Sequence, residues 1–224
     1  MYYSLTPAVV QGEVAYFTET SGMSAYALTT GSLLWSVALP AGSYEPALAN
    51  GKAYAYRSGT LHEIDLVTGQ VRKVIVEQYL AGLSGPSSRV VVSGAYAYIA
   101  GHDGLLKVDL ATGARAWQMS GSFGWPVVVG DKLFVLSGGV LQMRSASSGA
   151  LGWYWPQTSL GQIGDQLIVV GKHAFISDGA ATRAIDIDTQ QQVWMDTASG
   201  KLAISPNGIL YIDSALGLVG VNLR

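Results

Sequence analysis

The stretch Lys107-Val-Asp-Leu-Ala-Thr-Gly-Ala-Arg-Ala-Trp117 is the clearest copy of the unit that this chain repeats. Val108 and Leu110 are apolar residues at the period-2 spacing of a β-strand. Asp109 stands four residues before Gly113, where its carboxylate can accept the backbone N–H groups of the following turn. Gly113 suits the left-handed position that closes a type I turn with a bulge, and the tryptophan then falls on the returning strand. We therefore interpret the stretch as a β-hairpin.

The same hairpin recurs along the chain. Its turn position is occupied by Gly31, Gly69, Gly113, Gly149 and Gln190, which lie 38, 44, 36 and 41 residues apart. Four short strands with their turns fill roughly 40 residues, the length of one blade of a β-propeller. Four residues after the turn the copies carry Trp35, Lys73, Trp117, Trp153 and Trp194.

A second hairpin recurs six times with nearly the same spacing. Its turn glycines are Gly12, Gly51, Gly94, Gly130, Gly171 and Gly208, which are 39, 43, 36, 41 and 37 residues apart. If the strands of one blade are named A to D in chain order, this hairpin joins A to B, and the Thr-Gly hairpin joins C to D. Each blade is therefore predicted to have four antiparallel strands, with a short strand A.

The sixth unit is cut after its third strand. Gly217–Arg224 fits strand C, and no strand D follows, whereas Tyr2–Leu5 is strand-like and has no A–B hairpin before it. We predict an all-β fold, a six-bladed β-propeller whose last blade is closed by the N-terminal strand, which removes two open sheet edges. The whole chain, 1–224, is expected to form one domain. Its predicted blades are 7–40, 41–78, 79–120, 121–157, 158–197, and 198–224 together with 1–6.

The composition argues against several classes of protein. Only 12% of the 224 residues are charged, against roughly 25% in typical domains. The net charge of -2 provides no basic surface for nucleic acid, and no apolar run reaches the roughly 18 residues of a transmembrane segment. The chain has no cysteine, which excludes disulfides, thiolate metal sites and cysteine nucleophiles. No signal peptide is evident at the start of the sequence.

The pattern Leu/Tyr-x-Val/Ala-Asp-x-x-Thr-Gly-x-x-x-Trp resembles the PQQ-like repeat of quinoprotein and BamB-type propellers, over nearly the whole chain. Val108-Asp109, Thr112-Gly113 and Trp117 carry the resemblance best. The resemblance implies a bacterial protein outside the cytoplasm, periplasmic or secreted, although the residues alone leave the compartment open. It also implies that the tryptophans dock one blade on the next. The structural repeat residues would then be Trp35, Trp117, Trp153, Trp194, Gly31, Gly69, Gly113 and Gly149.

Catalytic constellations are not evident in the sequence. Quinoprotein dehydrogenases of the resembled family hold a quinone and calcium with a specific acidic and amide set, of which we find no copy. We therefore predict no cofactor and no metal. The three histidines, His62, His102 and His173, fall in separate blades and lack the spacing of a zinc site. His62 is expected to be a surface residue of a strand.

The candidate binding surface is the propeller face that carries the D–A and B–C connections. Exposed aromatic residues among few charges suit a protein or glycan partner. The alternative is that Tyr44 and Trp125 pack beside the prolines that follow them. The candidate residues are Tyr44, Glu45, Arg57, Tyr79, His102, Asp103, Trp125, Asp178 and Arg183.

These features favour a non-catalytic binding or scaffold propeller, monomeric as an isolated domain, that presents a loop face to a protein or glycan. The alternative is an enzyme, a hydrolase or lyase with a polar site at the propeller axis, where carboxylates would gather with His102. A quinone-dependent oxidoreductase is a further alternative. The sequence leaves the question of an enzyme open.

Overall fold

The computed structural model describes residues 8–40, 45–57, 59–76, 90–101, 103–155 and 167–223. The regular secondary structure within these ranges consists of β-strands. The described part of the chain has no helix with the length and hydropathy needed to cross a membrane. Its strands form six antiparallel sheets, five of four strands and one of three. The chain divides into two compact units, Met1–Gly121 and Ser122–Arg224, which we describe separately.

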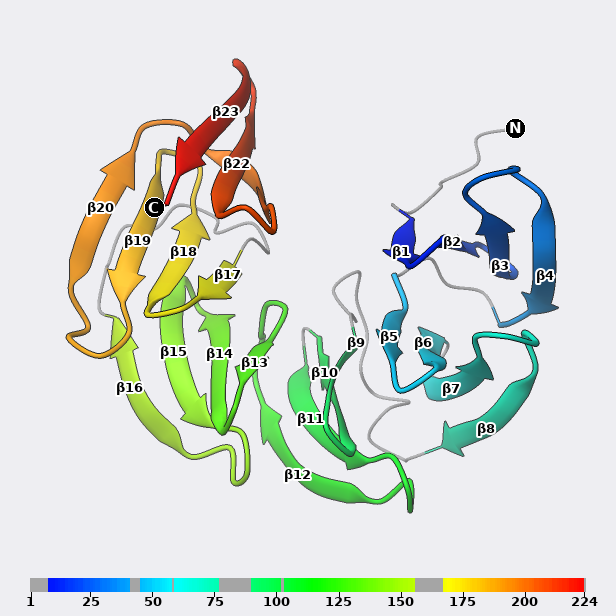
Figure 1. Cartoon of the computed structure of the whole chain (residues 1–224). Coiled ribbons are helices and arrows are strands. Elements are labelled where there is room, and N and C mark those ends of the chain that lie inside the picture. The colour runs from blue at the N-terminus through cyan, green and yellow to red at the C-terminus, as the bar shows by residue number, and fades with distance from the viewer. Residues whose placement is uncertain are drawn as a thin grey trace. The chain divides into compact units, whose positions relative to one another are not determined.

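The first unit holds three sheets, each with four strands in chain order (Figure 1). Sheet 1 consists of β1 (Val9–Gln11), β2 (Val14–Glu19), β3 (Gly22–Ala27) and β4 (Leu33–Ala38). Sheet 2 consists of β5 (Ala47–Ala49), β6 (Lys52–Arg57), β7 (Thr60–Asp65) and β8 (Val71–Val76). Sheet 3 consists of β9 (Val90–Ser93), β10 (Tyr96–Ala100), β11 (Gly104–Asp109) and β12 (Arg115–Ser120).

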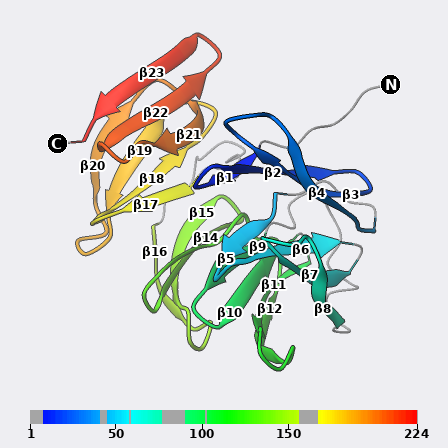
Figure 2. The ribbon, with the colours of Figure 1, turned by 45° about the vertical axis from the view of Figure 1, so that its right-hand side comes forward.

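The second unit holds the other three sheets. Sheet 4 consists of β13 (Val127–Val129), β14 (Lys132–Ser137), β15 (Val140–Ser145) and β16 (Leu151–Trp155). Sheet 5 consists of β17 (Leu167–Val170), β18 (His173–Ser177), β19 (Thr182–Asp186) and β20 (Gln192–Asp196). Sheet 6, labelled in Figure 2, consists of β21 (Gly200–Ile204), β22 (Ile209–Ser214) and β23 (Gly217–Asn222).

The all-β class and the four-stranded antiparallel sheets predicted from the sequence are confirmed. The predicted closing strand, Tyr2–Leu5, lies outside the described residues. Closure of the last blade and the total number of blades in the closed fold therefore stay predictions.

The Thr-Gly hairpin has the geometry that its residues predict. The Asp109 carboxylate accepts the backbone N–H of Thr112 at 2.8 Å and the Thr112 hydroxyl at 3.1 Å. Gly113 has a φ of 77°, and the register between β11 and β12 shifts beside Val108, as a bulge requires. In sheet 2 the Thr68 backbone N–H and its neighbours lower the pKa of the equivalent Asp65 to about 2.

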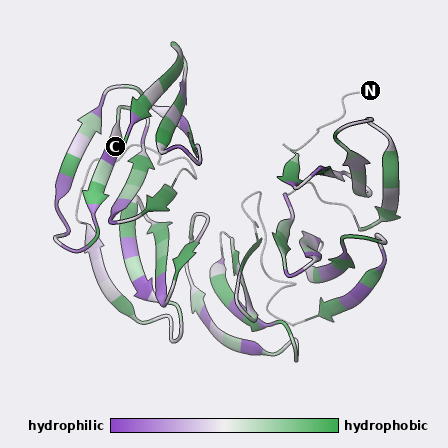
Figure 3. Cartoon of the chain, in the orientation of Figure 1, coloured by the Kyte–Doolittle hydropathy of each residue, from purple (hydrophilic) through white to green (hydrophobic). Residues whose placement is uncertain are grey.

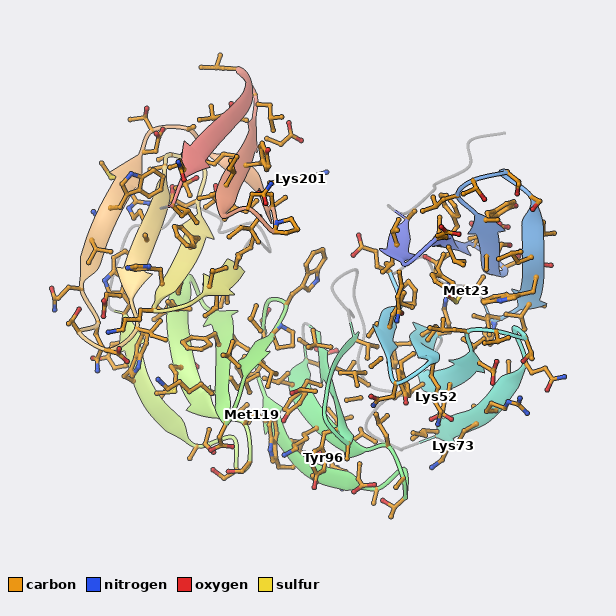
Figure 4. All side chains as sticks on the ribbon, viewed as in Figure 1. Met23, Lys52, Lys73, Tyr96, Met119 and Lys201 are labelled. Atoms are coloured by element: carbon orange, nitrogen blue, oxygen red, sulfur yellow. The ribbon has the colours of Figure 1, made fainter. Side chains whose placement is uncertain are left out.

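The hydrophobic core lies between neighbouring sheets of the same unit. One cluster joins sheets 1 and 2 through Tyr16, Trp35 and Ile64, with Met23 in the space between them (Figure 4). Similar clusters join sheet 2 to 3, sheet 4 to 5 and sheet 5 to 6. Figure 3 shows hydrophobic residues in the strands of every sheet. Because β6 is covered on both faces, it is buried almost throughout rather than alternately.

Candidate functional site

In the first unit, the residues four positions after Gly31 and Gly69 join one sheet to the next. The Trp35 indole Nε1 donates to the carbonyl of Leu66 at 2.9 Å. Its ring packs over Gly69, where an added Cβ would stand 2.6 Å from the indole. Lys73, labelled in Figure 4, holds the same position in sheet 2, and its Nζ donates to the carbonyl of Leu110 at 2.9 Å. The shared requirement is therefore an N–H donor that reaches the carbonyl one residue after the turn aspartate.

Tryptophans at this position also pack against the next sheet in the second unit. Trp153 packs against the cluster that contains Ile176 and Ile185 of sheet 5, and it lies 6.3 Å, ring to ring, from Phe134 of its own sheet. Trp194 packs against the cluster that contains Leu210 and Ile212 of sheet 6. In the first unit, the Trp117 ring lies 6.0 Å from the Tyr98 ring on its own sheet.

A hollow of about 420 Å³ opens on sheet 1. Its walls include Phe17 and Tyr26, whose rings meet edge to face at 5.6 Å, and Leu28, which is 52% exposed. Because successive residues of a strand face opposite sides, these walls lie on the other face of sheet 1 from Tyr16 and the core shared with sheet 2. The hollow is therefore an apolar surface on a sheet face rather than among the loops.

The residues around this hollow are the counterparts of those that receive Trp35 on sheet 2. Ala15 pairs with Tyr26 in β2 and β3 as Ala53 pairs with Ile64 in β6 and β7. The turn N–H of Gly31 bonds to the Ala27 carbonyl as that of Gly69 bonds to the Asp65 carbonyl. A Cβ on Gly31 would meet nothing within 4 Å, whereas one on Gly69 would strike the Trp35 ring. The hollow thus corresponds to a docking socket that is filled on sheet 2. The sequence predicts the turn at Gly31, but only the strand register shows which residues surround this turn.

A second hollow, of about 610 Å³, lies in the second unit between sheets 5 and 6. Phe175 and Trp194 line its apolar part, and Lys172, His173 and Asn222 add polar groups. Val221 and Asn222 of β23, with Leu223, form its wall on the side of sheet 6.

Three of the nine predicted loop residues, Tyr44, Tyr79 and His102, lie outside the described residues. In the first unit Glu45 is half-buried and Asp103 is exposed. In the second unit Trp125 is half-buried beside Phe123 and Pro126, which are buried. The loop set is therefore a mixture of exposed and packed side chains.

Asp178 and Arg183 are brought together at the β18–β19 hairpin. An Asp178 carboxylate oxygen pairs with the Arg183 guanidinium. The other oxygen accepts the backbone N–H groups of Ala180 at 2.7 Å and Ala181 at 2.8 Å. Asp178 is buried, and its bonds hold its own turn in place. Acid–base hydrolysis needs two carboxylates, and this pair contains one.

Arg57 is 1% exposed. It lies at the end of β6, and its Nη2 donates to the carbonyl of Gly22 in sheet 1 at 3.3 Å. The hairpin that it begins closes with a bond of 2.7 Å from the Thr60 hydroxyl to the Arg57 carbonyl. Arg57 therefore fixes one hairpin of sheet 2 against one of sheet 1, and burial lowers the pKa of its guanidinium.

The expectation that His62 is a surface residue is wrong, because the side chain is only 7% exposed. Both faces of β7 are covered by neighbouring sheets, which strand alternation alone does not reveal. Burial, and then the charge of Arg57, lower the pKa of His62. Its Nε2 lies 2.7 Å from the Thr60 hydroxyl oxygen. Since that hydroxyl already donates its single hydrogen to Arg57, Nε2 carries the proton in this bond.

The part of the chain that the structure describes contains no group of three or more histidine, aspartate or glutamate side chains placed to hold a metal ion. Asp186 instead accepts the backbone N–H groups of Asp188 at 3.0 Å and Thr189 at 2.8 Å. These bonds give Asp186 the same turn-capping role that Asp109 has in sheet 3.

The family model for the outer membrane protein assembly factor BamB matches residues 101–222, slightly more than half of the chain. The model of the LVIVD repeat matches residues 84–111. No curated protein sequence matches the chain.

Among solved structures, the chain is similar to BamB from Moraxella catarrhalis, with a TM-score of 0.72 and 16% identity over 96% of this chain and 70% of that one. PorZ of Porphyromonas gingivalis, a surface component of the type-IX secretion system, gives a TM-score of 0.73 and 14% identity over 96% and 31%. The dihydro-heme d1 dehydrogenase NirN, in complex with DHE, gives 0.74 and 14% over 98% and 54%. At these identities the likeness shows the fold alone, and the chain spans between 31% and 70% of these proteins.

Proposed function

Because the chain belongs to the BamB family of β-propellers, we propose that it is a non-catalytic binding or scaffold module whose partner is a protein. BamB is by name an assembly factor for outer membrane proteins, and PorZ is a component of a secretion system. Each name describes a protein that acts together with other proteins, which favours a protein partner over a small substrate. They equally favour a bacterial protein outside the cytoplasm.

The observation that carries this proposal is the apolar hollow on sheet 1. Its counterpart on sheet 2 accepts a tryptophan from a neighbouring strand, with the ring over Gly69 and the N–H on a carbonyl. The hollow offers the same parts, with Gly31 as its floor and Leu28 at the position of the accepting residue. The partner that fits is a β-strand that presents a tryptophan, because such a strand supplies both the ring and the donor. Binding of this partner and the predicted closure of the last blade over the same face are therefore alternatives.

The loop face is the second contact surface that we propose, as the sequence suggested. In the second unit Trp125 presents a half-buried indole, which can contact a protein or the apolar face of a sugar ring. The enzyme alternative requires free carboxylates near His102. Asp178, the buried carboxylate of the loop set, is instead bonded to Arg183 and to its own turn.

The proposed socket is tested with 5-fluoroindole as a probe, followed by ¹⁹F NMR during titration with the protein. We expect saturable binding in about the millimolar range, equivalent to about 4 kcal/mol. Leu28→Asp should abolish the binding by placing a charge on the apolar wall. Leu34→Asp is the matched control, because Leu34 is also 52% exposed in sheet 1 but does not line the hollow. Equal binding by both variants would refute the socket.

The loop face is tested separately with Trp125→Ala. Titration with maltohexaose, followed by tryptophan fluorescence, decides whether this surface takes a glycan. A change that saturates in the wild type and disappears in Trp125→Ala, at unchanged melting temperature, supports a glycan site there. A lowered melting temperature without any sugar-dependent change identifies Trp125 as a packing residue.

A further inference from the structure

Arg57 is the largest of the fully buried side chains in the described residues. Its Nη2 reaches the carbonyl of Gly22, but its Nε and Nη1 have no hydrogen-bond partner within the described ranges. A guanidinium has five N–H groups in a rigid plane, so most of its donor capacity is unused. Buried polar groups are nearly always hydrogen-bonded, and an exception of this kind needs a physical explanation.

Among the described residues, no carboxylate balances the charge of Arg57. The other buried cations and anions in the described residues are compensated, since Glu63 pairs with Lys52 at 2.7 Å and Asp178 pairs with Arg183. The buried Lys107 lies over the ring of Tyr96, 3.9 Å from its centroid. Arg57 forms no ion pair with a described carboxylate. Arginine stays protonated in proteins even when it is buried. A buried charge without a counter-charge is strongly unfavourable.

Thr60 and His62, the described neighbours of Arg57 in β7, do not supply a negative charge. Thr60 presents its hydroxyl to the Arg57 carbonyl and to His62, and not to the guanidinium. His62 is close enough for the charge of Arg57 to lower its pKa. Because a histidine is either neutral or positive, it cannot balance the charge of Arg57. The surroundings of Arg57 therefore favour an added anion.

We propose that Arg57 is the anchor of a binding site for a small oxyanion, such as a carboxylate or phosphate ion taken from solution. Arginine suits this ligand because its planar donors match the oxygens of a carboxylate or phosphate. The side chain is 1% exposed, so the occupant next to its guanidinium is a small ion rather than a macromolecule. The site does not depend on the proposed protein-binding function, because it lies towards the interface of sheets 1 and 2 and not at the hollow.

The expected consequence is that a bound anion stabilises the fold, because a ligand that binds only the folded state raises its stability with concentration. The melting temperature of the wild type is measured in sodium chloride, with acetate or phosphate exchanged in at constant ionic strength. We expect a saturable rise with acetate or phosphate. Arg57→Met should lose this rise. Arg144→Met should keep it, because Arg144 is a half-buried arginine whose Nε and Nη1 are bonded to Gln142 and Gly149.

A second measurement keeps the test decisive if Arg57→Met does not fold. In wild-type protein labelled with ¹⁵N-arginine, the Nε–H resonance of Arg57 should shift during the same titration and saturate at the same concentration. An internal water as the only occupant would leave both the melting temperature and the resonance insensitive to the anion, which overturns the proposal. An equal rise in the wild type and Arg57→Met means an adventitious ion only, and overturns it as well.

Discussion

Replacing Trp35 by phenylalanine separates the two parts of the contact between sheets 1 and 2. The indole is 8% exposed, packs 5.9 Å from the Tyr16 ring and donates to Leu66 at 2.9 Å. Phenylalanine keeps most of the ring contact but leaves the Leu66 carbonyl without its donor in a buried place. We expect a loss of about 1–3 kcal/mol in the free energy of unfolding, the usual cost of an unsatisfied buried group. Trp35→Ala removes the ring as well and should cost about 3–5 kcal/mol.

The measurement is urea-induced unfolding followed by circular dichroism, with Lys73→Met as the comparison. Lys73 makes the equivalent contact through Nζ, at 2.9 Å to Leu110 and 2.6 Å to Ala111. Because Lys73 is half-buried and its partners are partly exposed, water can replace the lost bonds, and we expect a loss of less than about 1 kcal/mol. If Trp35→Phe unfolds within about 0.5 kcal/mol of the wild type while Trp35→Ala does not, ring burial alone joins the sheets and the reasoning about the N–H donor is wrong.

Three further predictions concern single residues. The backbone N–H of Thr68 and its neighbours lower the pKa of Asp65 to about 2, so its ¹³C carboxyl titration should have a midpoint near that value. Because this folded pKa lies below the unfolded one, the stabilisation should be complete above about pH 4 and disappear as the pH falls towards 2. Burial and Arg57 lower the pKa of His62, so the unfolded state takes up more protons and stability should fall below about pH 6.5. His62→Gln should flatten that slope, and an unchanged slope would contradict the assignment. Gly69→Ala should cost clearly more than Gly130→Ala, since both glycines have positive φ but only Gly69 meets the Trp35 ring; equal melting temperatures would exclude the clash.

The features that sequence reasoning predicted well are local ones. The turn at Gly113 is determined within five residues, because the Asp109 carboxylate holds Thr112 and glycine takes the left-handed position. Repetition of this turn at nearly constant spacing then predicts the four-stranded antiparallel sheet. The match of the BamB family model confirms the resemblance to PQQ-like repeats.

The features that the sequence did not predict depend on contacts between sheets. Arg57 was expected on a loop face, yet its guanidinium bonds to Gly22, a residue 35 positions earlier. His62 was expected at the surface because a strand pattern shows alternation but not which faces are covered. The roles proposed from sequence for Tyr44, Tyr79 and His102 stay predictions, as does closure by Tyr2–Leu5.

The exchange of tryptophan for lysine between sheets 1 and 2 shows what this type of contact requires. Trp35 and Lys73 differ in shape and charge, yet each donates to the carbonyl that follows the turn aspartate. That carbonyl is positioned by the turn itself, since the glycine N–H bonds back across it in the same way at Gly69 and Gly113. The accepting side is thus built by local chemistry, and the donating side needs only length and an N–H group. By the same reasoning, the turn that ends at Gly31 builds an accepting side on sheet 1, which supports our proposal that the hollow there is a socket.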